Sequence, residues 1–311
     1  MQSLKEIEKR IKKKIKRIIE KDKNKWPKDK LVNEMTRRYS KRFNTTFDVN
    51  NPVLFTEKIQ WYKLFYKNEL LPRIVDKYEF KQFIRERLGD GYTIPLYALY
   101  NSFSEFKKGW NQLPEEFCLK STVSGSGKNI IIIHHKSEEN YSEIMNIVKQ
   151  WFDPHNTLIN SFEIGYHDCK ARVIAEEYME NIDEQLFDYK IFCFEGRPYC
   201  IYAASEHFKS DDFLNGYPIS FYDLTWNKLD VKYGNHRNDD IPPPKHLDEM
   251  INHAVSLSKG FPFVRVDFFD TDDKLYLAEM TFYPGGGMTK YEPESFNKEL
   301  GELFHLPNEM K

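Results

Sequence analysis

The sequence predicts an α+β fold in which antiparallel hairpins alternate with amphipathic helices. Three pairs of short apolar segments, each joined by a polar turn, are typical of hairpins: Phe117–Thr122 with Asn129–His135, Asp188–Phe194 with Arg197–Ala204, and Phe263–Phe269 with Lys274–Thr281. Apolar residues at helical spacing predict helices over Phe55–Tyr66, Asp76–Leu88, Glu139–Phe152, His246–Lys259 and Ser295–Phe304. Helices and hairpins mixed along one chain indicate the α+β class.

Composition and charge divide the chain into a basic arm and an acidic body. The 311 residues are 40% hydrophobic and 30% charged, enough for a core of two or three subdomains. Residues 1–43 carry 17 Lys and Arg against 6 Asp and Glu, a net charge of +11, so the rest, with 29 against 42, carries −13. No apolar run has the length of a membrane span or the place of a signal segment, and the four cysteines lack metal-type spacing. We expect a cytoplasmic protein with reduced thiols.

The arm, residues 1–50, begins with an amphipathic pattern. Apolar residues recur every three or four positions, at Leu4, Ile7, Ile11, Ile15, Ile18 and Ile19, with Lys and Arg between them, which predicts a basic helix. Two interpretations stay open: peripheral contact of residues 1–25 with an anionic membrane surface, and packing against the body or a partner chain. Binding to nucleic acid is disfavoured, because the body is acidic and no aromatic residues interleave the stripe.

The helix over residues 76–88 begins with a capping residue and carries two lysines. Asp76 is a plausible N-cap. Lys77 and Lys81 lie four residues apart, which puts them on one face of this helix. We interpret Lys81 as a solvated or helix-pairing side chain.

The first hairpin has a turn rich in glycine and serine, Ser124–Lys128. Small residues allow backbone N–H groups to approach phosphate oxygens, and Lys120 and Lys128 add positive charge. The turn is therefore a candidate phosphate-binding loop. The alternative is an ordinary hairpin with a flexible tip.

The last hairpin carries Asp267 and Glu279 inside otherwise apolar strands. A carboxylate in a half-buried strand is costly unless it is paired or ligates a cation. Two of them on adjacent strands, followed by Pro284–Gly287, favour a magnesium site beside an anion-binding loop. The alternative is a hairpin whose carboxylates face solvent.

These motifs occur in an order that resembles the ATP-grasp superfamily, and more closely its TupA-like branch, found in polysaccharide and teichuronopeptide biosynthesis loci. The matching stretches are FTEKIQWYKLF, VDKYEFKQFI, FCLKSTVSGSGKNI, RVIAEEYM, DYKIFCFEGRPYCI, FYDLTWN and FPFVRVDFFD…LYLAEMTFYPGGG, which cover roughly residues 53–305. The resemblance implies two α+β lobes that clasp ATP, with a basic N-terminal helical extension. It divides the chain into the arm at 1–50, an N-terminal helical or α+β subdomain at 51–115, a first lobe at 116–180 and a second lobe at 181–311.

The resemblance also implies roles in nucleotide binding, position by position. Lys120 and Lys77 match lysines that contact phosphates, and Ser124, Gly125, Ser126, Gly127 and Lys128 match the loop that closes over them. Glu176, Glu177, Tyr178 and Met179 match the hinge whose backbone groups bond adenine. Asp188 matches an acidic residue that holds the ribose hydroxyls, and Lys190 falls near the phosphates.

The metal and the chemistry follow from the same resemblance. Asp267 and Glu279 match the ligands of one or two Mg²⁺ ions, with Glu279 as the bridge between two. Many ATP-grasp enzymes place an asparagine two residues after this glutamate as a third ligand, and here Thr281, a weaker oxygen donor, takes that position. Arg265 matches an arginine that steadies an acyl phosphate, and Lys120 and Lys128 add to the neutralisation of charge.

The implied activity is that of an ATP-dependent carboxylate–amine ligase, ADP-forming, that acts through an acyl phosphate in cell-surface polysaccharide biosynthesis. The substrate would be a small molecule or glycan, with a uronic acid supplying the carboxylate and an amino acid or amino sugar the amine. A sugar kinase and a glycosyltransferase of a polysaccharide locus are alternatives, the latter disfavoured because no DxD motif follows an early strand. An idle binding module is disfavoured because the Lys120, Asp267 and Glu279 set is intact.

Overall fold

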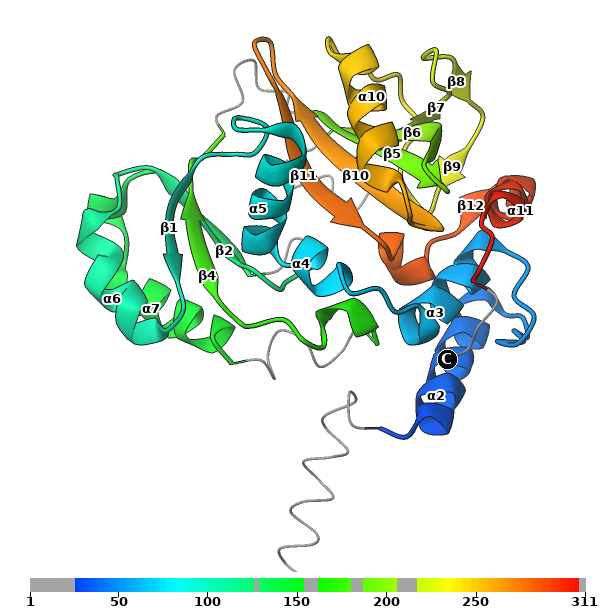
Figure 1. The fold of residues 1–311 in the computed structure, drawn as a ribbon, viewed down its shortest axis with the longest axis horizontal. Helices are drawn as coiled ribbons and strands as arrows, with labels where there is room; N and C mark the ends of the chain where they lie inside the picture. Colours follow the sequence, from blue (N-terminus) through cyan, green and yellow to red (C-terminus); the bar gives the residue numbers. More distant parts are fainter. Residues whose placement is uncertain (1–25, 126–128, 154–161, 180–186, 206–216, 308–311) are drawn as a thin grey trace, which may run out of the picture.

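The computed structural model describes residues 26–125, 129–153, 162–179, 187–205 and 217–307. In this part of the chain, a four-stranded antiparallel sheet has the order β1-β4-β2-β3 and a six-stranded one the order β11-β10-β5-β6-β7-β8. Figure 1 shows the smaller sheet on the left and the larger one at the upper right. Helices mixed with antiparallel sheets confirm the predicted α+β class.

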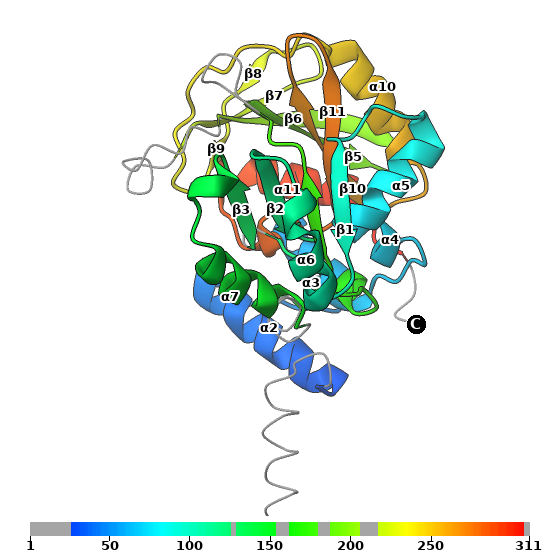
Figure 2. The same ribbon diagram turned by 90° about the vertical axis from the view of Figure 1, so that its left-hand side faces the viewer.

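The four-stranded sheet is covered by helices on one face. Its strands are β1 (Leu96–Tyr100), β2 (Phe117–Ser121), β3 (Ile130–Ile133) and β4 (Val173–Glu176). The covering helices are α6 (Phe103–Gly109), the 3-10 turn Trp110–Gln112 and α7 (Tyr141–Trp151), seen in front of the sheet in Figure 2. Phe106 and Val148 from these helices pack with alternate strand residues such as Leu119 and Val173 in one buried cluster. The opposite face is left for other contacts.

The six-stranded sheet lies at the centre of the larger core. Its strands are β5 (Phe187–Phe194), β6 (Arg197–Ser205), β7 (Ile219–Tyr222), β8 (Lys228–Leu229), β10 (Phe263–Asp270) and β11 (Leu275–Thr281), and a small separate ladder joins β9 (Lys232–Tyr233) to β12 (Tyr291–Glu292). Helix α10 (Leu247–Ser258) packs against this sheet. Helices α3 (Phe55–Phe65) and α11 (Glu294–Leu303) pack together, and the Phe55 ring lies 4.9 Å from that of Phe263.

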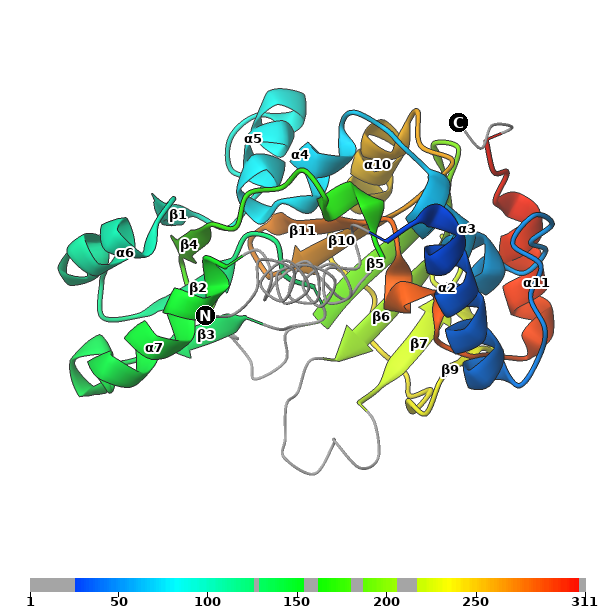
Figure 3. The ribbon, with the colours of Figure 1, turned by 90° about the horizontal axis from the view of Figure 1, so that it is seen from below.

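Two short helices join the sheets. α4 (Leu71–Val75) and α5 (Lys77–Leu88) both contact β11, and the backbone N–H of Lys77 donates to the carbonyl of Thr122, just after β2, at 2.8 Å. Figures 1 and 3 show α4 and α5 between the smaller sheet and β11. The helix α2 (Lys28–Phe43) packs against α3, where the Tyr39 hydroxyl bonds that of Thr56 at 2.9 Å.

Within the described residues, the predicted helices and hairpin strands named above begin and end within two residues of the observed bounds. The Asp76 cap is confirmed, since its Oδ1 accepts from the N–H groups of Tyr78 and Glu79 at 2.9 and 3.0 Å. The amphipathic pattern over residues 4–19 lies outside the described residues. None of the described helices is long and apolar enough to cross a membrane. All four cysteines are free thiols.

Candidate active site

Lys77, at the first turn of α5, lies where charged groups from both sheets meet. Its Nζ donates to the carbonyl of Ser124, in the turn after β2. Burial lowers the pKa of Lys77, the negative charge of Glu279 on β11 raises it, and the positive charge of Lys120 on β2 lowers it. Charge effects of this kind act over short range, and α5 also contacts β11. The structure therefore brings together three predicted site residues from α5, the smaller sheet and the larger sheet.

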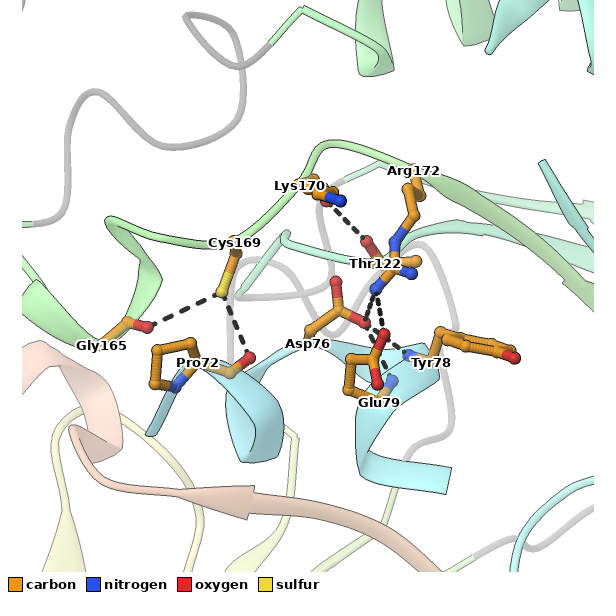
Figure 4. Close-up of polar contacts among 9 residues, drawn as sticks. All are labelled: Pro72, Asp76, Tyr78, Glu79, Thr122, Gly165, Cys169, Lys170 and Arg172. Carbon is orange, nitrogen blue, oxygen red and sulfur yellow. Dashed lines mark hydrogen bonds and ion pairs between the residues drawn. The ribbon is translucent and has the colours of Figure 1, made fainter. Parts of the chain in front are cut away.

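The N-terminus of α5 is held in place by a buried network, drawn in Figure 4. Arg172, one residue before β4, places Nη2 at 3.0 Å from Asp76 Oδ1 and at 2.9 Å from Glu79 Oε1. The Thr122 hydroxyl donates to the carbonyl of Lys170. Because the same segments carry Lys77 and lead into β4, this network fixes α5 against the sheet.

Glu176, the last residue of β4, bridges two lysines. Its Oε1 lies 2.5 Å from Lys120 Nζ, and its Oε2 lies 2.8 Å from Lys81 Nζ. Burial raises the pKa of Glu176, but the two positive charges outweigh that effect and bring the pKa below its ordinary value. The interpretation of Lys81 as a solvated or helix-pairing residue is wrong. Its ammonium is buried, because it reaches Glu176 at the end of β4 and the carbonyl of Ile94.

Apolar side chains surround Lys120 on its face of the sheet. Lys120 lies opposite Ile130, and Cys118 lies opposite Ile132 and Glu176, so these residues share one face. Ile130 and Ile132 are 37% and 47% exposed, although isoleucine is usually buried. The sequence analysis missed them as site residues. The signal is the strand of four isoleucines, since a strand with only one covered face needs an apolar residue at every second position.

The predicted metal hairpin forms, with a register shift between Asp267 and Phe268. Asp267 on β10 lies opposite Glu279 on β11 and Lys190 on β5, so the three side chains point to the same face. Lys190 Nζ lies 3.8 Å from Asp267 Oδ2 and also pairs with Asp188. The second oxygen of Asp188, Oδ1, is buried and has no hydrogen-bond partner among the described residues.

Arg265 holds Asp267 through two hydrogen bonds, from Nε at 2.7 Å and from Nη2 at 2.5 Å. It also donates to the Thr281 hydroxyl at 3.2 Å. Burial raises the pKa of Asp267, whereas the charges of Arg265 and Lys190 lower it. Burial acts to lower the pKa of Arg265, but Asp267 outweighs it and the pKa is raised, so the guanidinium stays charged.

The carboxylates of Asp267 and Glu279 fit a magnesium ion. Within the described ranges, Glu279 has no ion pair or hydrogen bond at contact distance, although its charge acts on Lys77 and Arg265. No group of three or more His, Cys, Asp or Glu side chains suited to a metal occurs there. Mg²⁺ is commonly held by one or two protein carboxylates, with waters and substrate phosphates completing the sphere. The Asp267 and Glu279 carboxylates therefore match the protein share of such a donor set.

The predicted hinge follows β4 directly. The Glu177 N–H donates to the carbonyl of Pro95 at 2.9 Å, so this group is engaged within the protein. The Tyr178 ring lies 4.8 Å from that of His134, edge to face. Met179 is described at the end of this segment, whereas Ser126, Gly127 and Lys128 of the predicted loop lie outside the described residues.

The glycine segment Pro284–Gly287, interpreted above as anion-binding, is held from α3. Gln60 Nε2 donates to the carbonyls of Gly286 and Gly287 at 2.8 and 3.0 Å, and Lys63 Nζ donates to Gly286 at 3.1 Å. The N–H of Gly286 bonds the carbonyl of Tyr283. These contacts fix the loop as a structural turn and leave the Gly286 N–H unable to bind an anion.

Solved structures with some similarity to this chain are ligases. D-alanine–D-alanine ligase from Bacillus anthracis has 17% identity and a TM-score of 0.40, with 68% of this chain and 57% of that chain covered. The corresponding ligase from Helicobacter pylori has 14% identity and a TM-score of 0.42, with 75% of this chain and 61% of that chain covered. Phosphoribosylamine–glycine ligase from Thermotoga maritima has 13% identity and a TM-score of 0.41, with 70% of this chain and 50% of that chain covered. These likenesses are too low to transfer an activity, and this chain spans less than two thirds of each ligase.

The sequence gives the decisive comparison. No curated protein matches it. The model of the family described as TupA-like ATPgrasp matches residues 57–305, which include every described candidate residue named above. The order of motifs, the two sheets and the charged groups between them agree with that match. The chain belongs to the TupA-like ATP-grasp family.

Proposed function

We propose that this protein is an ATP-dependent, ADP-forming carboxylate–amine ligase. The observation that supports it is the meeting of Lys77 and Lys120 with Glu279 and Asp267 between the two sheets. Phosphoryl transfer requires positioning and neutralisation of charge more than a strong base. Cations suited to phosphates and carboxylates suited to Mg²⁺ meet that requirement, and bound Mg²⁺ would supply further positive charge at the phosphates.

The reaction has two displacements. A substrate carboxylate oxygen bonds to the γ-phosphorus of ATP as the bond to the β-phosphate oxygen breaks, which releases ADP. The nitrogen of an amine then attacks the acyl carbon, loses a proton, and expels phosphate. We assign Lys77 and Lys120 to the phosphates and Arg265 to the acyl phosphate, where a fixed guanidinium stabilises developing negative charge.

We also propose a place for this chemistry in cell-surface polysaccharide biosynthesis, with a uronic acid as the carboxylate and an amino acid or amino sugar as the amine. Support comes from the family match alone. For the nucleotide, the exposed Ile130 and Ile132 beside Lys120 offer an apolar surface to the adenine base, and we assign Asp188, whose Oδ1 has no hydrogen-bond partner among the described residues, to the ribose hydroxyls.

Turnover with paired substrates tests the proposal. ADP and phosphate should form only when a uronic acid and an amine are both present, and an amide should accumulate in equal amount. Lys120→Ala and Glu279→Ala should each lower the rate about 100-fold or more, as expected for lost stabilisation of transferred charge. ADP formation that survives both substitutions contradicts the assigned site. A stable phosphate ester in place of the amide identifies a sugar kinase instead.

The basic arm suggests contact with a membrane surface. α2 continues the positive charge of residues 1–25, and its Arg37 side chain is 64% exposed. Lys and Arg near an anionic surface each contribute about 1 kcal/mol. Deleting residues 1–25 should therefore weaken binding to vesicles that contain phosphatidylserine, and higher salt should weaken binding of the full chain. Equal binding by both chains contradicts this assignment.

A further inference from the structure

Lys81 on α5 is a buried cation that the proposed reaction does not use. Its Nζ lies 2.8 Å from Glu176 Oε2 and donates to the carbonyl of Ile94 at 2.7 Å. Two acceptors from different segments fix the position of the ammonium. The other oxygen of Glu176 lies 2.5 Å from Lys120 Nζ. One carboxylate thus links Lys81 to the lysine assigned to the nucleotide phosphates.

Glu176, Lys81 and Lys120 are all largely buried, so their charges interact strongly. The side chains of Glu176, Lys81 and Lys120 are 3%, 11% and 20% exposed, so Lys120 is the member with most access to a ligand. Water screens charges weakly at such sites. A carboxylate with a single lysine partner would therefore hold that lysine strongly and would compete with a phosphate for it.

We propose that Lys81 is a positioning residue that shares the charge of Glu176, so that Lys120 remains able to bind the phosphates of ATP. The inference rests on the proposed function. Lys81 does not touch the nucleotide in this account, and it acts through Glu176.

A purely structural role explains Lys81 less well. α5 already packs through Phe80, Phe83 and Ile84, which are buried. An apolar side chain of similar length would fill the position of Lys81 without the desolvation cost of a buried ammonium. We therefore expect the charge of Lys81 to act on the neighbouring charged groups. The groups that act on Lys81 are Glu176, Lys120 and Cys118, all on the face of the sheet that carries the candidate site.

The test compares ATP binding and turnover among variants of the full chain. Lys81→Met removes the charge and should raise the Kd and KM for ATP about tenfold, with kcat changed less than about threefold, because the loss falls on binding. Lys81→Arg keeps the charge, so its Kd and KM for ATP should lie within about threefold of the wild-type values. In the Glu176→Gln background, Lys81→Met should have less than about a twofold effect, because no carboxylate remains to be shared.

Arg85 provides a matched control on the same helix. It pairs with Asp90 at 2.7 Å, and both side chains are largely exposed. Arg85→Met also removes one cation from α5 and should leave the Kd for ATP unchanged. If Lys81→Met does not fold, Lys81→Gln, which retains a donor for the Ile94 carbonyl, carries the same comparison.

The outcomes separate the inference from the function on which it rests. Wild-type affinity in Lys81→Met, or an equal loss with and without Glu176, overturns the positioning role while the ligase assignment stands. No ATP binding by the wild-type protein overturns the proposed function, and the inference with it. Coupling to Glu176 together with rescue by arginine, both measured on ATP affinity, supports the role, because an effect of Lys81 that did not pass through Glu176 would show no coupling.

Discussion

Asp76 has two functions in the structure, and substitutions can separate them. Its Oδ1 caps α5 by accepting from Tyr78 and Glu79, and the same oxygen lies 3.0 Å from Arg172. Asp76→Ala removes both interactions. Asp76→Asn keeps an acceptor for the cap, because asparagine is as good an N-cap as aspartate, but removes the charge.

The magnitudes follow from burial. Loss of the cap costs about 1 kcal/mol. Breaking a buried ion pair costs about 3–5 kcal/mol. After Asp76 is replaced, Arg172 still pairs with Glu79 at 2.9 Å and is not left without a counter-charge. We therefore assign about 2 kcal/mol to the Asp76–Arg172 pair, below that range. The free energy of unfolding should therefore fall by about 3 kcal/mol in Asp76→Ala and by about 2 kcal/mol in Asp76→Asn.

Urea unfolding at neutral pH measures both values. Ser102→Ala is the matched control, since Ser102 caps α6 by accepting from the Glu105 N–H at 3.2 Å and, being uncharged, forms no ion pair. It should lose about 1 kcal/mol. An Asp76→Ala variant no less stable than Ser102→Ala refutes the contribution of the buried pair. Wild-type stability in Asp76→Asn refutes it independently.

Three further predictions concern a glycine and two titrating groups. A Cβ at Gly287 (φ +65°) would lie 2.3 Å from Gln60 Nε2, so Gly287→Ala should destabilise by about 3 kcal/mol in urea, against about 1 kcal/mol for Gly260→Ala, which has a positive φ but open space. The pKa of Glu176 is lowered in the folded state, so its contribution to stability is present above pH 4.5 and is lost as pH falls through the lowered pKa; acid titration of Glu176→Gln should show a shallower loss. Burial lowers the pKa of Lys77, so ATP affinity should fall as pH rises from that lowered pKa towards 10.5, and Lys77→Met should lack this dependence in calorimetric titrations.

The sequence allowed the last hairpin to be predicted, because Asp267 and Glu279 interrupt two apolar strands joined by a short acidic turn. Its register was not predicted, since a bulge between Asp267 and Phe268 shifts the pairing by one residue and brings Asp267 opposite Glu279. The Asp76 cap was equally accessible, because capping depends on residues close in sequence. Local patterns therefore gave the elements and two of the central site residues.

Contacts between segments distant in sequence could not be predicted in the same way. The burial of Lys81 depends on its reaching Glu176 at the end of β4, and the exposure of Ile132 depends on helices covering only the other face. The short strands β7, β8 and β9, between residues 219 and 233, were not predicted either. Strands of two to four residues carry little periodic signal, and tertiary pairing decides whether they form.

The most direct test of the account is calorimetric titration of ATP, with and without Mg²⁺, into the wild-type protein and Glu279→Ala. We predict that the wild-type protein binds ATP more tightly with Mg²⁺, and that Glu279→Ala keeps the metal-independent binding through Lys77 and Lys120 but loses the gain from the metal. Equal gains from Mg²⁺ in both proteins contradict the metal assignment. If neither protein binds ATP but a nucleotide sugar binds, the ligase assignment is wrong and a glycosyltransferase takes its place.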